Sequence, residues 1–161
     1  MMHVEKNMTA TQRIRQHWDN QPGLPRHRGA DPKAIDAFEA RHCVVVLADF
    51  REYLRELNGL PEAKTREGWD NVDSTGFEFL PLAMLRPTQQ SASFFVFARW
   101  ALGDMSYAIC LVPSRYHGCV VAVVEDSLHV IAGSFEAFAQ MYVEDSVSLY
   151  GGGPAVDASD Y

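Results

Sequence analysis

Apolar residues recur at helical spacing near the middle of the chain. Phe50, Tyr53, Leu54 and Leu57 occupy positions i, i+3, i+4 and i+7, so all four lie on one face of a predicted helix, while charged residues take the other face. Gly59 predicts where this helix stops, because glycine adopts the left-handed conformation without a clash at Cβ. The pattern therefore predicts an amphipathic helix that packs against a core.

Two earlier helices are predicted from their first residues. Thr9 and Gln12 have the spacing of a capping box, which predicts a short helix from about residue 10 to residue 18. Asp31 precedes a proline, an arrangement that favours a helix start, and apolar positions then continue at helical spacing over 32–42. The turn-rich stretch between the two helices predicts a linker.

Strand patterns dominate the second half of the chain. Four segments are rich in β-branched and aromatic residues: "SFFVFARW" (93–100), "MSYAICLV" (105–112), "CVVAVVED" (119–126) and "SLHVIA" (127–132). Short connections with turn signals separate them, which predicts an antiparallel meander. The segment 105–112 carries apolar or small residues on both faces, so we expect it to be a central strand.

The pattern returns to helical spacing after the last strand. Ser134 is a good N-cap, and Phe135, Phe138 and Tyr142 mark one face of the helix that follows. Together these elements predict an α+β fold, in which an antiparallel meander sheet of about five strands has helices packed on one face. The predicted organisation is an N-terminal helix and linker (1–30), one domain (31–150) and a flexible tail (151–161).

Composition agrees with an ordinary globular protein. Of 161 residues, 47% are hydrophobic and 22% are charged, which argues against wholesale disorder. The net charge of −7 either favours a cationic partner or keeps the protein dispersed in solution. The N-terminal stretch lacks a secretory signal and no apolar run is long enough to span a bilayer, so we expect a cytoplasmic protein without membrane contact. We expect Cys43, Cys110 and Cys119 to be buried, reduced thiols.

A search for catalytic chemistry finds no constellation. His117 and Cys119 offer only half of a structural zinc site, and the residues from Asp70 to Asp73 lack the spacing of a calcium loop. His129 is more typical of a hydrogen-bonded residue than of a general base. Basic residues are too dispersed for a nucleic-acid footprint. We therefore predict no catalytic residue, metal or cofactor, and no nucleic-acid partner.

The order of the elements resembles that of the SUKH superfamily, which contains fungal cell-wall-synthesis regulators of the Smi and Knr type and many bacterial immunity proteins. The matching signals are the "FREYLRELNG" helix, the "FEFLPLAML" segment, the aromatic strand "FFVFARW" and the "IAGSFEAFAQMY" start of the last helix. The resemblance extends over about residues 31–142. The chain departs from the family pattern at Leu47-Ala48, where members usually have Leu-Pro, and in its longer polar stretch at 62–76.

The resemblance implies a binding module and not an enzyme. Bacterial relatives of this kind neutralise a polymorphic toxin by binding its catalytic domain, and an acidic surface would suit a basic nuclease toxin. Two alternatives remain: a regulatory or scaffold module of the same fold, and a small hydrolase or ligand-binding protein with an unrecognised pocket. We expect a monomer or a weak homodimer.

A candidate contact patch lies in the long polar stretch. Trp69 with Asp70 and Asp73 combines an aromatic anchor with carboxylates, a composition enriched at binding hot spots. The alternative is that Trp69 folds back onto the edge of the core. Trp100 and Asp104, at the end of a strand and in its turn, form a second candidate patch.

Overall fold

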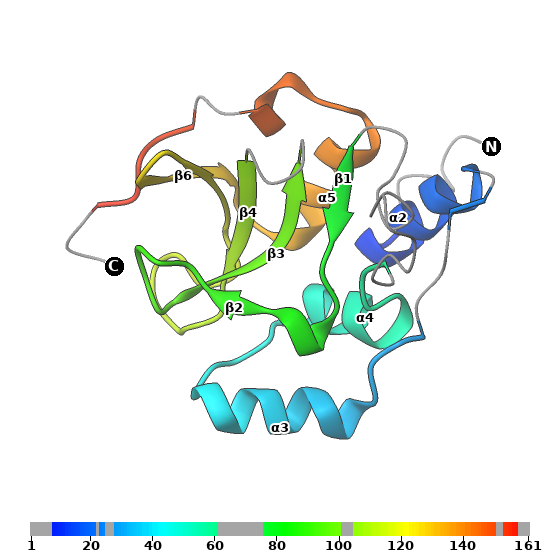
Figure 1. Ribbon diagram of the computed structural model, residues 1–161, viewed down its shortest axis with the longest axis horizontal. Coiled ribbons are helices and arrows are strands. Elements are labelled where there is room, and N and C mark those ends of the chain that lie inside the picture. The colour runs from blue at the N-terminus through cyan, green and yellow to red at the C-terminus, as the bar shows by residue number, and fades with distance from the viewer. Residues whose placement is uncertain are drawn as a thin grey trace, which may run out of the picture.

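The computed structural model describes residues 8–21, 23–24, 28–60, 76–100, 105–150 and 153–157, and Figure 1 shows the arrangement of their helices and strands. In chain order the elements are α2 (Ala10–Asp19), α3 (Pro32–His42), α4 (Ala48–Glu56), β1 (Phe77–Phe79), the 3-10 helix η1 (Leu82–Met84), β2 (Arg86–Pro87), β3 (Phe94–Trp100), β4 (Met105–Cys110), β5 (Val120–Val124), β6 (Ser127–Ala132), α5 (Phe135–Val143) and the 3-10 helix η3 (Val147–Tyr150).

The strands form one antiparallel sheet in the order β1-β3-β4-β5-β6, and the short β2 also pairs with β3. The predicted central strand is confirmed, because β4 lies in the middle of this order and Tyr107 to Cys110 are buried on both faces. The register of β3 against β4 shifts between Val96 and Ala98, which leaves Phe97 as an extra residue in β3. The α+β prediction is therefore confirmed.

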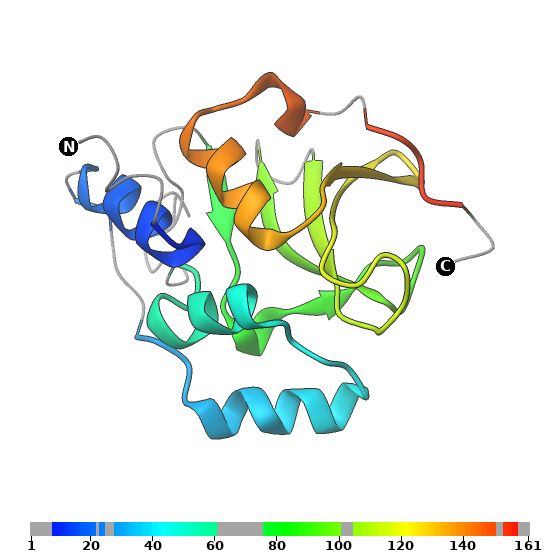
Figure 2. The ribbon, with the colours of Figure 1, turned by 180° about the vertical axis from the view of Figure 1, so that it is seen from behind.

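Helices cover one face of the sheet, which we call the inner face. Viewed from that side, α4 and α5 lie in front of the strands and α2 lies beside them (Figure 2). The N-terminal helix belongs to the same core, since Ile14 and Trp18 are buried and the indole Nε1 of Trp18 donates a hydrogen bond to the hydroxyl of Tyr142 over 2.9 Å. The helix predicted at 10–18 is confirmed as α2.

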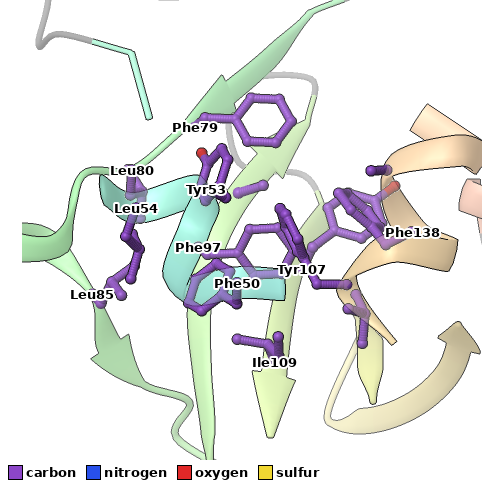
Figure 3. Packing of buried hydrophobic residues seen from close by; sticks show 14 of the residues in the cluster. Phe50, Tyr53, Leu54, Phe79, Leu80, Leu85, Phe97, Tyr107, Ile109 and Phe138 are labelled. Carbon is purple, nitrogen blue, oxygen red and sulfur yellow. The ribbon is translucent and has the colours of Figure 1, made fainter. Parts of the chain in front are cut away.

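Aromatic rings fill the space between the helices and the sheet. Phe50 of α4 lies close to Phe97 of β3 (Figure 3), and the ring of Tyr53 packs against that of Phe135 in α5. The ring of Phe50 lies 5.0 Å from that of Phe135, and Phe97 contacts Phe138 edge to face at 5.1 Å. Burial raises the pKa of the Tyr53 hydroxyl, so this side chain stays neutral. The apolar residues that recur at helical spacing over 50–57 are thus the ones that α4 packs into the core.

Capping residues fix where the helices around this core begin. The caps predicted at Asp31 and Ser134 are confirmed, since Asp31 Oδ1 accepts from the Lys33 amide and Ser134 Oγ accepts from the Ala137 amide. Asp49 joins two helix starts, because its carboxylate accepts from the Phe50 amide at 2.7 Å and from the Glu136 amide at 3.0 Å. This one carboxylate couples the first turns of α4 and α5.

The residues that end α4 also tie three segments together. Asn58 has φ of 53° and Gly59 has φ of 70°, so the predicted left-handed stop is confirmed. The buried Asn58 side chain accepts from the Leu82 amide at 2.7 Å and donates to the Arg28 carbonyl at 3.3 Å. A Cβ at Gly59 would lie 2.7 Å from the Phe79 carbonyl oxygen. Glycine is required here both for its backbone conformation and for close packing against β1.

α3 lies outside the layer of helices that covers the sheet and packs with only two buried side chains, Ile35 and Phe38. Arg51 of α4 holds it through ion pairs with Asp36 and Glu39. The second oxygen of the Glu39 carboxylate accepts from the Val46 amide at 2.8 Å. Polar contacts with α4 therefore supplement a small apolar contact.

The opposite, outer face of the sheet carries a second apolar cluster. We call it the outer cluster; its buried members are Phe94, Ala108, Cys110, Val121, Leu128 and Val156. Val156 comes from the C-terminal segment that we expected to form a flexible tail. Residues 153–157 instead lie along β6, with backbone bonds from Val130 to Pro154 and from Val156 to Leu128. Nothing in the sequence indicates this pairing, because so short a segment carries no periodic pattern.

The prediction that all three cysteines are buried is wrong for Cys43. This residue caps α3 in the left-handed conformation, with φ of 54°, and is exposed, while the neighbouring Val44 and Val46 enter the core. Cys110 is buried and Cys119 is partly buried. Burial, and to a smaller extent the nearby Cys110, raises the pKa of the Cys119 thiol, which disfavours the reactive thiolate.

Candidate interaction surface

The outer face is hollowed where β2 meets β3. This outer hollow has a volume of about 310 Å³, and its walls come from β2, the turn after it and the central strands. Val96 and Val123 contribute apolar surface, whereas Arg86, Arg99 and Ser106 contribute polar groups. The hollow continues the outer face beyond the outer cluster. The outer cluster therefore covers one part of the outer face of the sheet, and the outer hollow leaves another part open.

A second hollow lies between α3 and η1 and has a volume of about 280 Å³. We call it the α3 hollow. Small and apolar side chains line it, including Ala34, Ala37 and Leu82, and the polar groups in its lining are Arg41, His42 and Arg86. It exists because α3 stands away from the sheet, with alanine at the positions that face η1.

Arg86 lines both hollows and has a fixed orientation. Its Nη1 atom donates to the carbonyl oxygens of Ala83 at 3.1 Å and Leu85 at 2.8 Å. Two main-chain contacts hold the guanidinium at the boundary between the hollows. Among the described residues no carboxylate forms an ion pair with it.

Arg99 differs from Arg86 in its electrostatic environment. Its Nη1 atom lies 3.5 Å from the Glu78 carboxylate across the β1–β3 pair. The charge of Arg99 is therefore partly balanced within the sheet. Of the two arginines that line the outer hollow, Arg86 is therefore the one whose charge no described carboxylate balances.

The predicted contact residues fall mostly outside the described ranges. Trp69, Asp70, Asp73 and Asp104 lie in segments 61–75 and 101–104, which the structure does not describe. Trp100 ends β3, is half-buried and packs against Tyr150 with ring centroids 4.7 Å apart. A contribution of these residues to partner binding stays a prediction.

The surroundings of Trp100 combine apolar and acidic groups. Val147, at the start of η3, is 84% exposed, and the exposed Asp145 accepts a hydrogen bond from the Tyr150 hydroxyl at 2.6 Å. Phe77 pairs with Trp100 across β1 and β3, so the described residues that adjoin segments 61–75 and 101–104 lie close together at this edge of the sheet. The two segments that carry the candidate patches thus join the described structure at neighbouring points.

Sequence reasoning missed Arg86 and both hollows. A single arginine between Leu85 and Pro87 belongs to no motif, and the walls of the hollows come from segments far apart in the chain. The sole available signal was the proline after it, which is typical of an edge strand.

Two other expectations concern metal binding and membranes. Within the described ranges, no group of three or more His, Cys, Asp and Glu side chains is placed to hold a metal ion. His117 contacts the Val45 carbonyl through Nε2 at 2.9 Å, and His129 contacts the Gly153 carbonyl through Nδ1 at 3.1 Å, as expected for a hydrogen-bonded histidine. None of the helices described combines the length and the apolar character needed to cross a bilayer.

Comparison with known proteins identifies the family. The family model described as SMI1 / KNR4 family (SUKH-1) matches residues 29–141, which is more than half of the chain. A search of curated proteins gives no match. The matched range runs from the segment before α3 to Met141 in α5, and so it contains the whole sheet and both hollows. The chain therefore belongs to the SMI1/KNR4 family (SUKH-1).

Proposed function

We propose that this protein is a bacterial immunity protein, which neutralises a cognate toxin domain by binding to it and performs no catalysis itself. Family membership carries the proposal: members of the family are generally non-enzymatic, and members bind toxin partners. The match spans the sheet and the helices that cover it. Neutralisation requires a complementary surface and not a nucleophile.

The arrangement of residues near Trp100 supports a partner-contact region at this edge of the sheet. Phe77 pairs with Trp100, so the segment that carries Trp69, Asp70 and Asp73 and the segment that carries Asp104 join the described structure at neighbouring points. The half-buried Trp100 and the exposed Val147 supply apolar surface beside them. Such a region has the aromatic and carboxylate composition of an interface hot spot.

The charge of the protein favours a basic partner. A net charge of −7 would speed the association with a cationic toxin, such as a nuclease, because complementary charge steers the encounter. A toxin must be bound quickly if the cell is to survive. The protein would act as a monomer or a weak homodimer in the cytoplasm, where such a toxin would be active.

A regulatory or scaffold module is the second candidate, because the same family includes the fungal cell-wall-synthesis regulators. The two candidates differ in their genomic context. An immunity protein is encoded beside a large secreted protein with a toxic C-terminal domain, whereas a regulator needs no such neighbour.

If a toxic domain is encoded beside this chain, co-expression with that domain tests the proposal. Cells that carry both should survive, and the two purified domains should associate at submicromolar concentration. Trp69→Ala should weaken binding by about 2 kcal/mol, roughly thirtyfold in Kd, with little change in Tm. Val45→Ala is the matched control, since Val45 is 44% exposed and lies near Leu111, beyond the other end of β4. Cell death despite abundant folded protein would reject the immunity function.

A further inference from the structure

We propose that the two hollows on either side of Arg86 form one docking surface, which recognises a segment of a protein partner that carries a carboxylate next to an apolar side chain. That the partner is the toxin domain rests on the proposed function. The chemistry of the recognised segment rests on the hollows alone.

The first step is the orientation of the Arg86 guanidinium. Its Nη1 atom is engaged by the carbonyls of Ala83 and Leu85, and no bond from Nε or Nη2 to a described residue is present. These two nitrogens form the side of the guanidinium that binds a carboxylate through two parallel hydrogen bonds. The arginine is therefore held in place and still presents the edge suited to a carboxylate.

The second step is the separation of charge on α3. Residues Ala34, Ala37, Phe38, Arg41 and His42 line the α3 hollow and share one face of the helix. Asp36 and Glu39 lie on the opposite face, where they pair with Arg51. The helix thus turns its carboxylates away from the hollow and its arginine toward it.

The local charge opposes that of the whole protein. The chain has a net charge of −7, yet no described residue that lines either hollow carries a carboxylate. Arg41 and Arg86 form no ion pair with a described residue, and Arg99 pairs with Glu78. A surface of this kind is complementary to an acidic segment, and it would discriminate against a uniformly basic one.

The apolar part of the surface argues for a protein segment and not a small anion. Phosphate or acetate would contact Arg86 and leave the alanines and Leu82 of the α3 hollow uncovered. A segment that places a carboxylate at Arg86 can insert a neighbouring apolar side chain into the hollow of about 280 Å³. Both hollows are then used by one occupant.

NMR titration of the full chain tests this surface without a known partner. The probe is the peptide acetyl-Glu-Leu-Glu-Leu-amide, compared with the peptide in which both glutamates are glutamine, and with acetate and inorganic phosphate at equal charge. We expect the acidic peptide to shift the amides of Ala37, Arg86 and Gln90 together, with little response to the glutamine peptide. Equal shifts from acetate or phosphate would indicate a general anion site and overturn the proposal, as would shifts scattered over the surface.

Variants separate the role of Arg86 from a general charge effect. Arg86→Glu should weaken binding of the acidic peptide by about tenfold or more, and Arg86→Lys should give an intermediate loss because it keeps the charge without the planar fork. Arg55→Glu removes the same charge from an exposed position on α4 that lines neither hollow. Equal effects of Arg86→Glu and Arg55→Glu, with both proteins folded by circular dichroism, would contradict the proposal.

The same pair of variants connects the surface to the toxin. If the domain encoded beside the chain binds the wild type and the Arg55→Glu variant but binds Arg86→Glu at least about tenfold more weakly, the docking surface is used for neutralisation. If Arg86→Glu does not affect binding of the toxin, the toxin does not bind at this surface, and the proposed immunity function still stands. Failure of the wild type to bind would reject the immunity function, and the peptide titration would still decide the chemistry of the hollows.

Discussion

The two faces of the sheet differ in how completely they are filled. On the inner face, the aromatic side chains of α4 and α5 pack against Phe97 and its neighbours, and these rings are almost fully buried. On the outer face, a small cluster that includes Phe94 and Leu128 ends at an open hollow of about 310 Å³. The difference indicates that stability resides mainly in one face, which leaves part of the other free for binding.

The β-bulge in β3 contributes to this asymmetry. The shift between Val96 and Ala98 lets both Phe97 and Ala98 belong to the inner core, whereas Val96 and Arg99 line the outer hollow. One extra residue therefore adds a large ring to the inner face without adding one to the outer face.

The largest effect is expected from Phe97→Ala. Removal of this fully buried ring leaves a cavity among Phe50, Phe135 and Phe138, and should lower the free energy of unfolding by about 3–5 kcal/mol. Val96→Ala, one residue earlier and half-exposed, should cost less than about 1 kcal/mol. Urea denaturation of both proteins measures the difference. Equal losses would show that the outer face contributes as much as the inner one.

Gly59→Val should be the next most destabilising change. A β-branched residue is strained at φ of 70°, and its Cβ would lie 2.7 Å from the Phe79 carbonyl oxygen, so we expect a loss of about 2–3 kcal/mol. A loss of this size would show that the junction between α4 and β1 contributes to stability in the same way as the inner face does. Thermal unfolding measures it, and an unchanged Tm would contradict the left-handed assignment.

A smaller effect is expected from Val156→Ala in the outer cluster. Val156 is 3% exposed, and its amide donates to the Leu128 carbonyl at 2.8 Å, a bond that alanine retains. The loss of two buried carbon atoms should therefore cost about 1.5 kcal/mol. Hydrogen exchange of the Val156 amide would show whether the segment still pairs with β6. A loss as large as that of Phe97→Ala would mean that the outer cluster is a second main core.

Local signals in the sequence predicted the helices well. Thr9, Asp31 and Ser134 each accept the capping hydrogen bond that their position implied, and Asn58 and Gly59 end α4 as expected. These features depend on a few consecutive residues, so their chemistry can be read directly from the chain. The central position of β4 was predictable for a similar reason, because residues on both of its faces are apolar or small.

Features that depend on contacts between distant segments were not predicted. The α3 hollow joins residues 34–42 to residues 82–86, and the pairing of 153–157 with β6 joins two segments without a periodic pattern. Cys43 is exposed because the chain turns at the end of α3, although its neighbours are apolar. The candidate residues Trp69, Asp70, Asp73 and Asp104 lie outside the described ranges, so the sequence remains the sole basis for them.

The smallest effect on stability is expected from Arg86→Gln. The side chain is exposed and its Nη1 atom bonds only to the carbonyls of Ala83 and Leu85, which water can satisfy, so the free energy of unfolding should change by less than about 0.5 kcal/mol. The isosteric swap Gln90→Glu beside it would place a carboxylate at the edge of the same hollow and should be equally neutral. Chemical denaturation at low and high salt measures both. A loss near that of Val156→Ala would give Arg86 a structural role in joining η1 to β2, and the division between a stabilising inner face and a free outer face would then no longer hold at this residue.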